Sequence, residues 1–524
     1  MKRSFTSLVT IVLLFVSVNW ALAATFTVTN LNNSGAGSLR QAMLDANAAG
    51  VGPHTIDFDP GLNGTINVTS SLPTITNANI TIDGGGVITL DGPGGDSNVT
   101  FFTISASSTT IQGFSLQNIG GSMFYVLGGL SNVTIDDMFI QSTSGNWINQ
   151  IVRVVGASTN MTIRGITSPS GMQDCYSSEG GRAFYFQDGT QTNLTIEDIN
   201  VFALCEGIVF RNASVNGLDI LNATIYNAYN GIIFFFFFCP VETANDVLID
   251  GENTARLYHQ RYGGGSGMIY SDFTNTMWTI QNLEIDSDRA NSGNDGNYGI
   301  RFDRTTNDVT IDNITMHDSE VYGVWFNGTA TDVTIQNSTF DNFDGYTGNQ
   351  MIRFEYATTD ITIDNVDIDL DVTGTTNDGN YGVLFRRQTA TNILINDLTV
   401  NEADEDGIYQ NDGAVVGFTL QNSTFTNNRD GIEFYGGNSH DNVLIDNNTF
   451  TGQTRGGILI HTGNATNNVD ITNNELMGGG SNAVWFYNGN GNRDIVVQQN
   501  EIAFNGGAGV YVNSSPDGIH ITQN

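Results

Sequence analysis

The chain has 524 residues, of which 54 are acidic and 18 are basic, and its formal net charge is −36. This balance argues against a nucleic-acid partner and against adhesion to anionic lipid, because both kinds of binding need a basic face. Lys2 is the only lysine, which excludes a lysine nucleophile, a Schiff base and a P-loop lysine.

The first 23 residues have the pattern of a secretory signal peptide. Lys2 and Arg3 precede an apolar run over residues 8–18, and Ala21–Ala23 supplies small residues at the cleavage position. The run is too short to span a bilayer, and no later segment has about 18 consecutive apolar residues. We therefore predict export to the medium or the bacterial outer surface, with a mature chain that starts at Ala24 and contains no membrane-spanning segment.

An N-terminal cap is predicted over residues 24–78, with a single helix at about 38–49. Ser38 and Gln41 form a capping box, and Gly50 ends the helix. Apolar residues recur at helical spacing between them: Leu39, Ala42, Met43 and Ala46. We expect this helix to cover the exposed edge of the first repeat.

From residue 79 to residue 524 the chain repeats one unit about every 27 residues. Each unit has an apolar–polar–Ile triplet, with Leu, Trp, Phe or Val variants, and a later second signature such as Tyr298–Phe302 or Tyr322–Phe326. Both segments alternate at period two, as strands do. Seventeen positions end the triplet: 82, 111, 135, 163, 196, 220, 249, 280, 311, 335, 363, 395, 420, 445, 471, 497 and 521.

Such short strands cannot form a core alone, but stacked units bury their apolar rows continuously. The sequence therefore predicts an all-β, single-stranded right-handed parallel β-helix of about 17 turns, with three short strands per turn and a capping helix. An Asn recurs shortly after the triplet and is typical of a turn residue with left-handed φ, and these side chains would stack into an amide ladder. Examples are Asn313, Asn337, Asn365, Asn422, Asn447 and Asn473. Because the sequence stops inside a turn at Asn524, we expect the repeats to be truncated there or to lack a C-terminal module.

Three segments near the N-terminus carry a resemblance to a known family: Thr25–Asn30, Gly37–Ala42 and Thr55–Phe58. With the export signal and the repeats, they resemble the exported bacterial right-handed parallel β-helix repeat proteins of the pectin-lyase-like superfamily that begin with a G-S-L-R-x-A capping segment. The resemblance implies a secreted or surface protein, often with a C-terminal anchoring module. Many such proteins have no assigned activity, so the fold does not decide the function.

Few catalytic motifs of β-helix enzymes are present. Of the N-T-D, D-D, G-H-G and R-I-K motifs of polygalacturonase-like hydrolases, only Asp136-Asp137 resembles one, and paired acids are common on a solvated strand face. The D-P-H motif of alginate epimerase-like proteins is absent, and the six His form no local ligand pair. No catalytic residue is predicted, although a lyase could still use an Arg base beside a cation.

Three acidic residues form the first candidate for a metal site. Asp367, Asp369 and Asp371 alternate with apolar residues, so a strand would place all three carboxylates on one face. Such close like charges repel unless a cation intervenes. A solvated acidic face is the favoured interpretation and no cofactor is required, with a calcium site as the alternative. A second candidate comprises Glu402, Asp404, Glu405 and Asp406.

Cysteine usage allows one disulfide in an exported chain. Cys175 and Cys205 both precede similar strands and could stack, whereas Cys239 lies beyond its strand. We predict a Cys175–Cys205 bond, which leaves Cys239 unpaired.

A column of outward residues is predicted along the second signature. Flat aromatics and Arg on a straight sheet could stack sugar rings, or neighbouring turns could stack their own aromatics for stability. The predicted carbohydrate-binding residues are Tyr185, Arg301, Trp325, Arg353, Tyr409, Tyr435, His461, Trp485, Tyr487 and Tyr511.

The sequence thus favours a non-enzymatic, structural or adhesive surface protein that binds an extracellular polysaccharide or a host or cell-surface glycan. The alternative is a polysaccharide lyase, glycoside hydrolase or uronan epimerase with an unfamiliar site. A groove in which Asp, Arg and His from adjacent turns converge would favour the enzyme.

Overall fold

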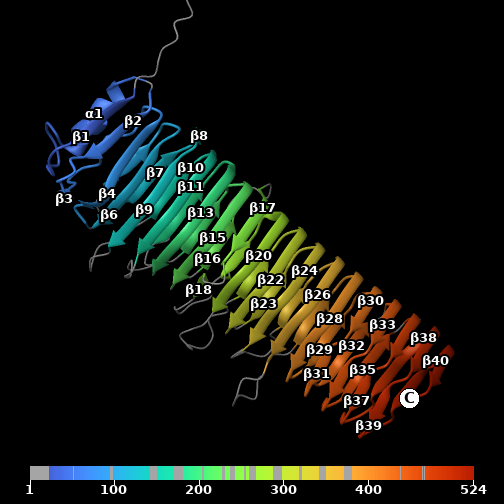
Figure 1. The fold of residues 1–524 in the computed structure, drawn as a ribbon. Coiled ribbons are helices and arrows are strands. Elements are labelled where there is room, and N and C mark those ends of the chain that lie inside the picture. Colours follow the sequence, from blue (N-terminus) through green and yellow to red (C-terminus); the bar gives the residue numbers. More distant parts are fainter. Residues whose placement is uncertain are drawn as a thin grey trace, which may run out of the picture.

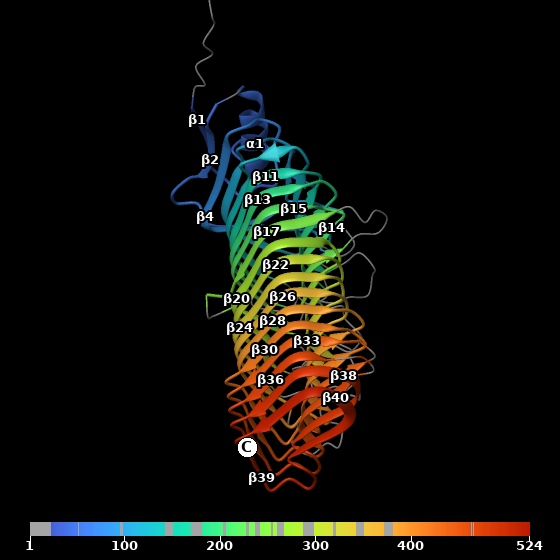
Figure 2. The ribbon, with the colours of Figure 1, turned by 90° about the vertical axis from the view of Figure 1, so that its right-hand side faces the viewer.

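The computed structural model describes residues 23–50, 52–94, 98–141, 150–168, 181–202, 206–226, 230–235, 242–252, 255–258, 267–286, 298–317, 321–341, 350–370, 381–436, 438–462, 464 and 466–524. Within these ranges the chain forms one α-helix and 40 strands, and every strand pairing is parallel. The strands wind into a right-handed parallel β-helix of about 16 turns. Figures 1 and 2 show an elongated rod with the helix at one end and the C-terminus at the other. The predicted fold class is confirmed.

Most of the strands fall into two sets that stack along the rod, and eight short strands remain. The first set carries the triplets: β2 (His54–Phe58), β4 (Ile80–Asp91), β6 (Thr110–Gln117), β9 (Thr134–Gln141), β11 (Ser158–Ser168), β13 (Gln191–Phe202), β15 (Val215–Tyr226), β17 (Thr243–Asp250), β20 (Thr274–Asp286), β22 (Thr306–His317), β24 (Ala330–Asp341), β26 (Thr358–Asp369), β28 (Ala390–Asn401), β30 (Val415–Gln421), β33 (His440–Asp446), β36 (Asn467–Thr472), β38 (Val484–Gln498) and β40 (Val510–Thr522). The second set carries the second signature, which also opens β38 and β40: β5 (Phe102–Ile104), β7 (Ser122–Leu127), β10 (Gln150–Val155), β12 (Arg182–Gln187), β14 (Glu206–Arg211), β16 (Asn230–Phe235), β19 (Ile269–Ser271), β21 (Tyr298–Phe302), β23 (Tyr322–Phe326), β25 (Gln350–Phe354), β27 (Tyr381–Arg386), β29 (Asp406–Asn411), β32 (Asp430–Gly436) and β35 (Gly456–Thr462). The remaining strands are β1 (Ala24–Val28), β3 (Gly64–Asn67), β8 (Leu130–Ser131), β18 (Arg256–Tyr258), β31 (Thr424–Thr426), β34 (Thr449–Thr451), β37 (Glu475–Met477) and β39 (Glu501–Ala503).

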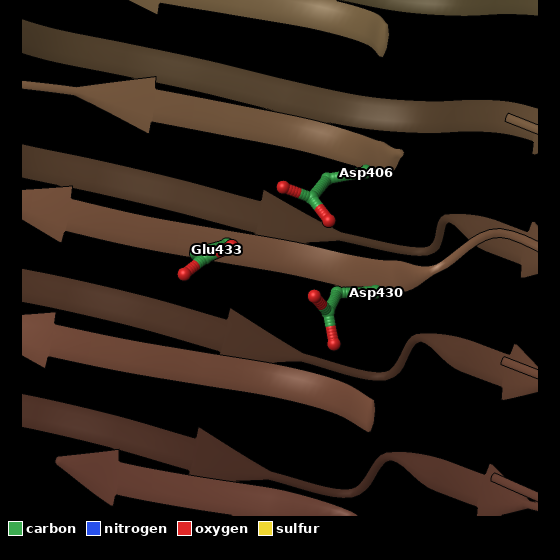
Figure 3. Close-up of side chains that lie close together, drawn as sticks. All are labelled: Asp406, Asp430 and Glu433. Carbon is green, nitrogen blue, oxygen red and sulfur yellow. The ribbon is translucent and has the colours of Figure 1, made fainter. Parts of the chain in front are cut away.

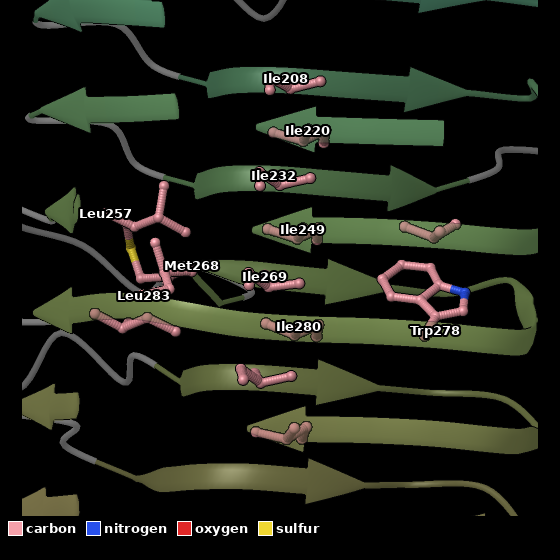
Figure 4. Packing of buried hydrophobic residues seen from close by; sticks show 14 of the residues in the cluster. Ile208, Ile220, Ile232, Ile249, Leu257, Met268, Ile269, Trp278, Ile280 and Leu283 are labelled. Atoms are coloured by element: carbon pink, nitrogen blue, oxygen red, sulfur yellow. The ribbon is translucent and has the colours of Figure 1, made fainter. Parts of the chain in front are cut away.

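The triplets form one unbroken ladder. All seventeen predicted positions pair in register from Ile82 to Ile521, and Ile56 adds one more at the N-terminal end. Ile196 and Ile335 are fully buried and belong to one continuous hydrophobic core. Figure 4 shows Ile232 of the second signature between the triplet residues Ile220 and Ile249. The predicted single core is confirmed.

The Asn that recurs two residues after the triplet turns the chain as predicted. All six predicted residues have φ between 51° and 56°. The amide Nδ2 of Asn447 donates to Oδ1 of Asn422 at 2.7 Å, and that of Asn365 donates to Oδ1 of Asn337 at 2.9 Å. Others donate to an Asp of the preceding turn, as Asn337 does to Asp312 at 2.7 Å. The amide ladder is therefore real but mixed with carboxylates.

Two internal stacks were not anticipated. Phe326 stacks on Phe354 at 5.0 Å and 4° between ring planes, and Phe354 stacks on Phe385 at 5.1 Å and 5°. Near the C-terminal end, Asn448, Asn474 and Asn500 are buried and linked by amide hydrogen bonds of 3.0 Å. Stacking of identical side chains in adjacent turns satisfies the buried amides and packs the rings face to face.

The single helix, α1 (Leu39–Ala48), follows the predicted capping box. Ser38 Oγ accepts a hydrogen bond from the backbone N–H of Gln41 at 3.2 Å. The four residues predicted to face the core are buried, and α1 packs on β1 and β2. Arg40 ties the helix to the next loop by donating to the carbonyl of Ser70 at 2.7 Å.

Some predictions lie outside the described residues. They include the signal peptide, apart from Ala23, and the pairing of Cys175 with Cys205. In the described part of the chain, no helix is long and apolar enough to cross a membrane.

Candidate functional site

The predicted outward column is a continuous row. The residues pair in register over sixteen turns: Thr103, Tyr125, Arg153, Tyr185, Val209, Ile233, Tyr270, Arg301, Trp325, Arg353, Leu384, Tyr409, Glu433, Leu459, Trp485 and Tyr511. A second row, two residues further along each strand, joins Arg386, Asn411, Tyr435, His461 and Tyr487. Sequence reasoning missed Tyr125, Arg153 and Tyr270 because the signature is weaker in those turns.

Two residues expected on the surface are buried, and this corrects the prediction. Tyr185 is 3% exposed, because Val209 and Ile233 pack beside it and Arg182 lies 4.6 Å from its ring. Arg353 is 6% exposed. Neither side chain offers a surface on which a sugar ring can stack.

In the middle of the column the protein covers its own aromatic faces. The guanidinium carbon of Arg301 lies 4.4 Å from the centre of the Trp325 ring, and Tyr298 and Tyr322 lie 5.3 Å and 4.9 Å from it. Tyr409 stacks on Tyr381 at 4.9 Å and 9°. For this stretch the alternative interpretation holds, since neighbouring turns stack their own rings.

A pocket of about 330 Å³ opens further along the two rows. Side chains of β32, β35 and β38, together with Arg455, line it: Glu433, Tyr435, Arg455, Leu459, His461, Trp485 and Tyr487. Four of the predicted binding residues therefore meet here, namely Tyr435, His461, Trp485 and Tyr487. The adjacent Tyr511 is 41% exposed and lies edge-on to Trp485 at 5.9 Å.

The rings of the pocket meet edge to face. His461 lies 4.7 Å from Tyr435 and 4.6 Å from Tyr487, with ring planes 83° and 84° apart, and Trp485 lies 5.7 Å from Tyr487. Tyr435 is 40% exposed. Burial lowers the pKa of His461, so its imidazole is neutral at pH 7 and can donate and accept hydrogen bonds. The edge-to-face contacts among these four rings form one aromatic wall of the pocket.

A buried carboxylate cluster lies beside this pocket and reaches it through Glu433. Asp406 of β29 and Asp430 of β32 are partners in register, and Glu433 follows on β32. Figure 3 shows the three side chains converging across the two strands. They are 0%, 1% and 4% exposed, and one ligand oxygen from each lies within 4.8 Å of the others.

Two arginines neutralise most of this charge. Arg429 donates to both carboxylate oxygens of Asp406 at 3.1 Å and 3.0 Å. Arg455 donates from Nε to Asp430 at 2.6 Å and from Nη2 to Glu433 at 2.5 Å. Pairing with these carboxylates raises the pKa of Arg455 despite the opposing effect of burial. Arg455 is thus held against Glu433 where both meet the pocket.

Burial and the neighbouring charges of Asp430 and Glu433 raise the pKa of Asp406 well above its ordinary value. A proton on Asp406 relieves the repulsion between stacked carboxylates. Because the three carboxylates already contact guanidinium groups, a divalent cation would have to displace Arg429 and Arg455. The cluster has the oxygen ligands that calcium takes, but its built-in counter-ions are the two arginines.

Only two residues of the predicted calcium site, Asp367 and Asp369, lie in the described part of the chain. Asp367 and Asp369 share a face of β26, and burial together with the charges of Asp369 and Asp341 raises the pKa of Asp367. Asp371 lies outside the described residues, so the calcium site stays a prediction. The Asp136-Asp137 pair is structural, since Asp136 pairs with Arg164 at 2.7 Å and Asp137 turns the chain at φ 53°.

One signal in the sequence could have located the cluster. Where Tyr298, Tyr322 and Tyr381 precede Gly in the second signature, two adjacent turns have Asp406-Gly407 and Asp430-Gly431 instead. In a stack, the same substitution in consecutive turns places two carboxylates side by side. Spacing along the chain groups Asp406 only with its neighbours Glu402, Asp404 and Glu405.

Comparisons with known proteins agree with the fold. The family model described as "Right handed beta helix region" matches residues 267–465 and 354–524. No curated protein sequence matches the chain.

Several solved structures are similar to the chain. They include the surface adhesin PfbA of Streptococcus pneumoniae, at 12% identity and a TM-score of 0.43, over 71% of this chain and 91% of that chain. The A-module of mannuronan C-5 epimerase AlgE6 from Azotobacter vinelandii gives 16% identity and a TM-score of 0.40, over 78% and 94%. The endo-xylogalacturonan hydrolase of Aspergillus tubingensis gives 13% and 0.32, over 74% and 95%. These similarities carry no argument about function.

Proposed function

We propose that the chain is an exported or cell-surface β-helix protein that binds a polysaccharide, with the pocket between β32 and β38 as its main binding site. The observation that carries the proposal is the convergence of Tyr435, Trp485 and Tyr487 with Arg455 and Glu433 on one opening of about 330 Å³. Aromatic faces stack on the apolar faces of sugars, and neighbouring charged groups bind hydroxyls. A rigid solenoid holds this set in place, so little conformational entropy is lost on binding.

The rows on either side of the pocket suit an extended ligand. Trp485 and Tyr511 succeed one another in register, one per turn, so two aromatic side chains follow each other about 4.8 Å apart along the rod, whereas the preceding Leu459 is buried. A polymer lying along the axis would contact several turns at once. Binding of this kind fits an adhesive or structural role.

A pair of matched tryptophan variants tests the proposal. Trp485→Ala should weaken binding of the cognate polysaccharide by about five- to thirtyfold, because a stacked aromatic anchor contributes roughly 1–2 kcal/mol. Trp325→Ala is the control: it lies in the same row, but Arg301 and two tyrosines already cover its ring. Affinity electrophoresis against a polysaccharide panel, followed by calorimetry, measures both. Equal affinities of wild type and Trp485→Ala would refute the pocket as the binding site.

Polysaccharide cleavage or epimerisation is the second candidate. It is favoured by one observation, the meeting of Glu433, Arg455 and His461 from neighbouring turns at the pocket. Glu433 is paired with Arg455 at 2.5 Å and with Arg429 at 3.4 Å, which suits binding and positioning more than proton transfer. Release of reducing ends or unsaturated products from uronan substrates, lost in Glu433→Gln, would establish the enzyme.

A further inference from the structure

One buried carboxylate on the same face is surrounded by three arginines. Glu355 follows β25 and its side chain is 4% exposed. Arg353 donates to it from Nε at 2.8 Å, Arg387 lies 3.0 Å away through its own Nε, and Nη1 of Arg386 lies at 3.7 Å. The group carries one negative charge against three positive charges.

Two of these arginines, Arg386 and Arg387, expose part of their side chains to solvent. Arg353 is buried and also donates to the hydroxyl of Tyr322 and to Gln350. The side chains of Arg386 and Arg387 are 36% and 51% exposed. In the part of the chain that the structure describes, neither has an ion pair within 4.0 Å other than the contact with Glu355. In a chain with a net charge of −36, this is a local excess of positive charge held by a fixed scaffold.

The backbone at Arg387 is unusual. Its φ is 67°, in the left-handed region. Residues at the same position of other turns also have positive φ, and they are Gly156, Asp188, Asn212, Asp412 and Gly436. Glycine, Asn and Asp tolerate this conformation, whereas a long side chain is disfavoured there. The strain retained at Arg387 points to a role for its guanidinium group.

The arginines lie in line with the pocket. Arg386 heads the row that continues through Asn411, Tyr435 and His461 in register. Two turns separate Arg386 from Tyr435, about 10 Å along the axis. A polymer seated in the pocket and running along the rod would pass over Arg386 and Arg387.

We propose that Arg386 and Arg387 bind an anionic group of the polysaccharide, either a carboxylate or a sulfate ester, and so select an acidic polymer. This proposal rests on the function proposed above. Two guanidinium groups side by side offer the paired N–H donors that such oxyanions bind in bidentate fashion. The incoming anion offsets the mutual repulsion of the three arginines.

The test compares the double variant Arg386→Gln/Arg387→Asn with wild type on three probes: polygalacturonate, dextran sulfate and neutral dextran. Asn suits the left-handed backbone, so the Arg387→Asn single variant should melt at the wild-type temperature or above it. An unchanged melting temperature therefore shows that weaker binding by the Arg387→Asn variant comes from the lost charge and not from misfolding. Arg256→Gln is the matched control: Arg256 lies on β18, its side chain is 50% exposed, and it pairs with Glu284 of β20 at 3.1 Å.

The double variant should bind the acidic probe about tenfold or more weakly, with a smaller salt dependence, while Arg256→Gln behaves as wild type. A loss confined to dextran sulfate assigns a sulfate, and one confined to polygalacturonate assigns a carboxylate. Equal binding of acidic and neutral probes by wild type, or no change in the double variant, overturns the proposal.

Trp485→Ala separates the two proposals. If the double arginine variant weakens binding of the acidic probe and Trp485→Ala does not, the anion site is supported and the pocket is refuted as the binding site. If Trp485→Ala weakens binding of dextran and wild type does not prefer the acidic polymers, the pocket is supported and the anion site is refuted. A wild type that binds none of the three probes overturns the anion site.

Discussion

His440 should make the stability of the chain fall in mild acid. Its side chain is fully buried inside the β-helix, where Nδ1 accepts a hydrogen bond from the backbone N–H of Val415 at 3.2 Å and the ring lies 5.3 Å from Phe434. Burial lowers the pKa of His440 to about 4, with a small opposing effect from the charge of Asp441. Nε2 is buried and has no hydrogen-bond partner among the described residues.

The sign and size of the effect follow from linkage. Because the folded-state pKa is lower than the unfolded value of about 6.5, the unfolded chain binds the extra proton between about pH 6.5 and about pH 4. The free energy of unfolding contributed by the neutral imidazole is present above about pH 6.5 and is lost as the pH falls toward about 4. One pKa unit corresponds to about 1.4 kcal/mol, so about 2.5 kcal/mol should be lost between about pH 7.5 and about pH 4.5.

His440→Val is the matched variant, because Val415 occupies the same position in the preceding turn. Urea unfolding of both proteins over this pH range measures the difference in free energy of unfolding, which cancels the carboxylates common to both. Wild type should lose about 2.5 kcal/mol relative to His440→Val on acidification. A difference that is independent of pH would show that His440 is protonated as readily in the folded state as in the unfolded state.

Two further variants test the internal polar groups. Asn474→Ala removes the amide that donates to the carbonyl of Ile445 at 2.9 Å and accepts from the backbone N–H of Asn448 at 2.9 Å, so it should lower the free energy of unfolding in urea by about 3 kcal/mol. The control Asn473→Gly keeps the left-handed φ of 56° and should lower it by about 1 kcal/mol or less. Similar losses in the two variants would contradict the role of the buried ladder. The free energy of unfolding of Asp406→Asn, measured in urea, should increase relative to that of wild type as pH rises. The carboxyl of Asp406 has a raised pKa, so the stability it contributes is present below its unfolded pKa and is lost as pH rises through its folded pKa. If the relative stability of the variant fell with pH, pairing of Asp406 with Arg429 would outweigh the repulsion from Asp430.

The fold was readable because each turn repeats the same local pattern. Period-two alternation places Ile82, Ile335 and Ile471 on an inward face, and a residue with positive φ, most often Asn, turns the chain after most triplets. These features depend only on near neighbours in sequence and on stacking in register. The capping helix likewise depends on Ser38 and Gln41, three residues apart.

The location of the candidate site could be found only from the tertiary structure. Sequence spacing placed Tyr185, Arg353 and Trp485 in one outward row, but it could not show that the first two are buried, since burial depends on side chains contributed by other turns. Only the stacked structure brings Asp406 against Asp430 and Glu433, and Arg386 and Arg387 onto Glu355. The sequence therefore determined the coil and its core through short-range periodicity, whereas charge neutralisation, burial and the pocket were decided by contacts between turns some 25 residues apart.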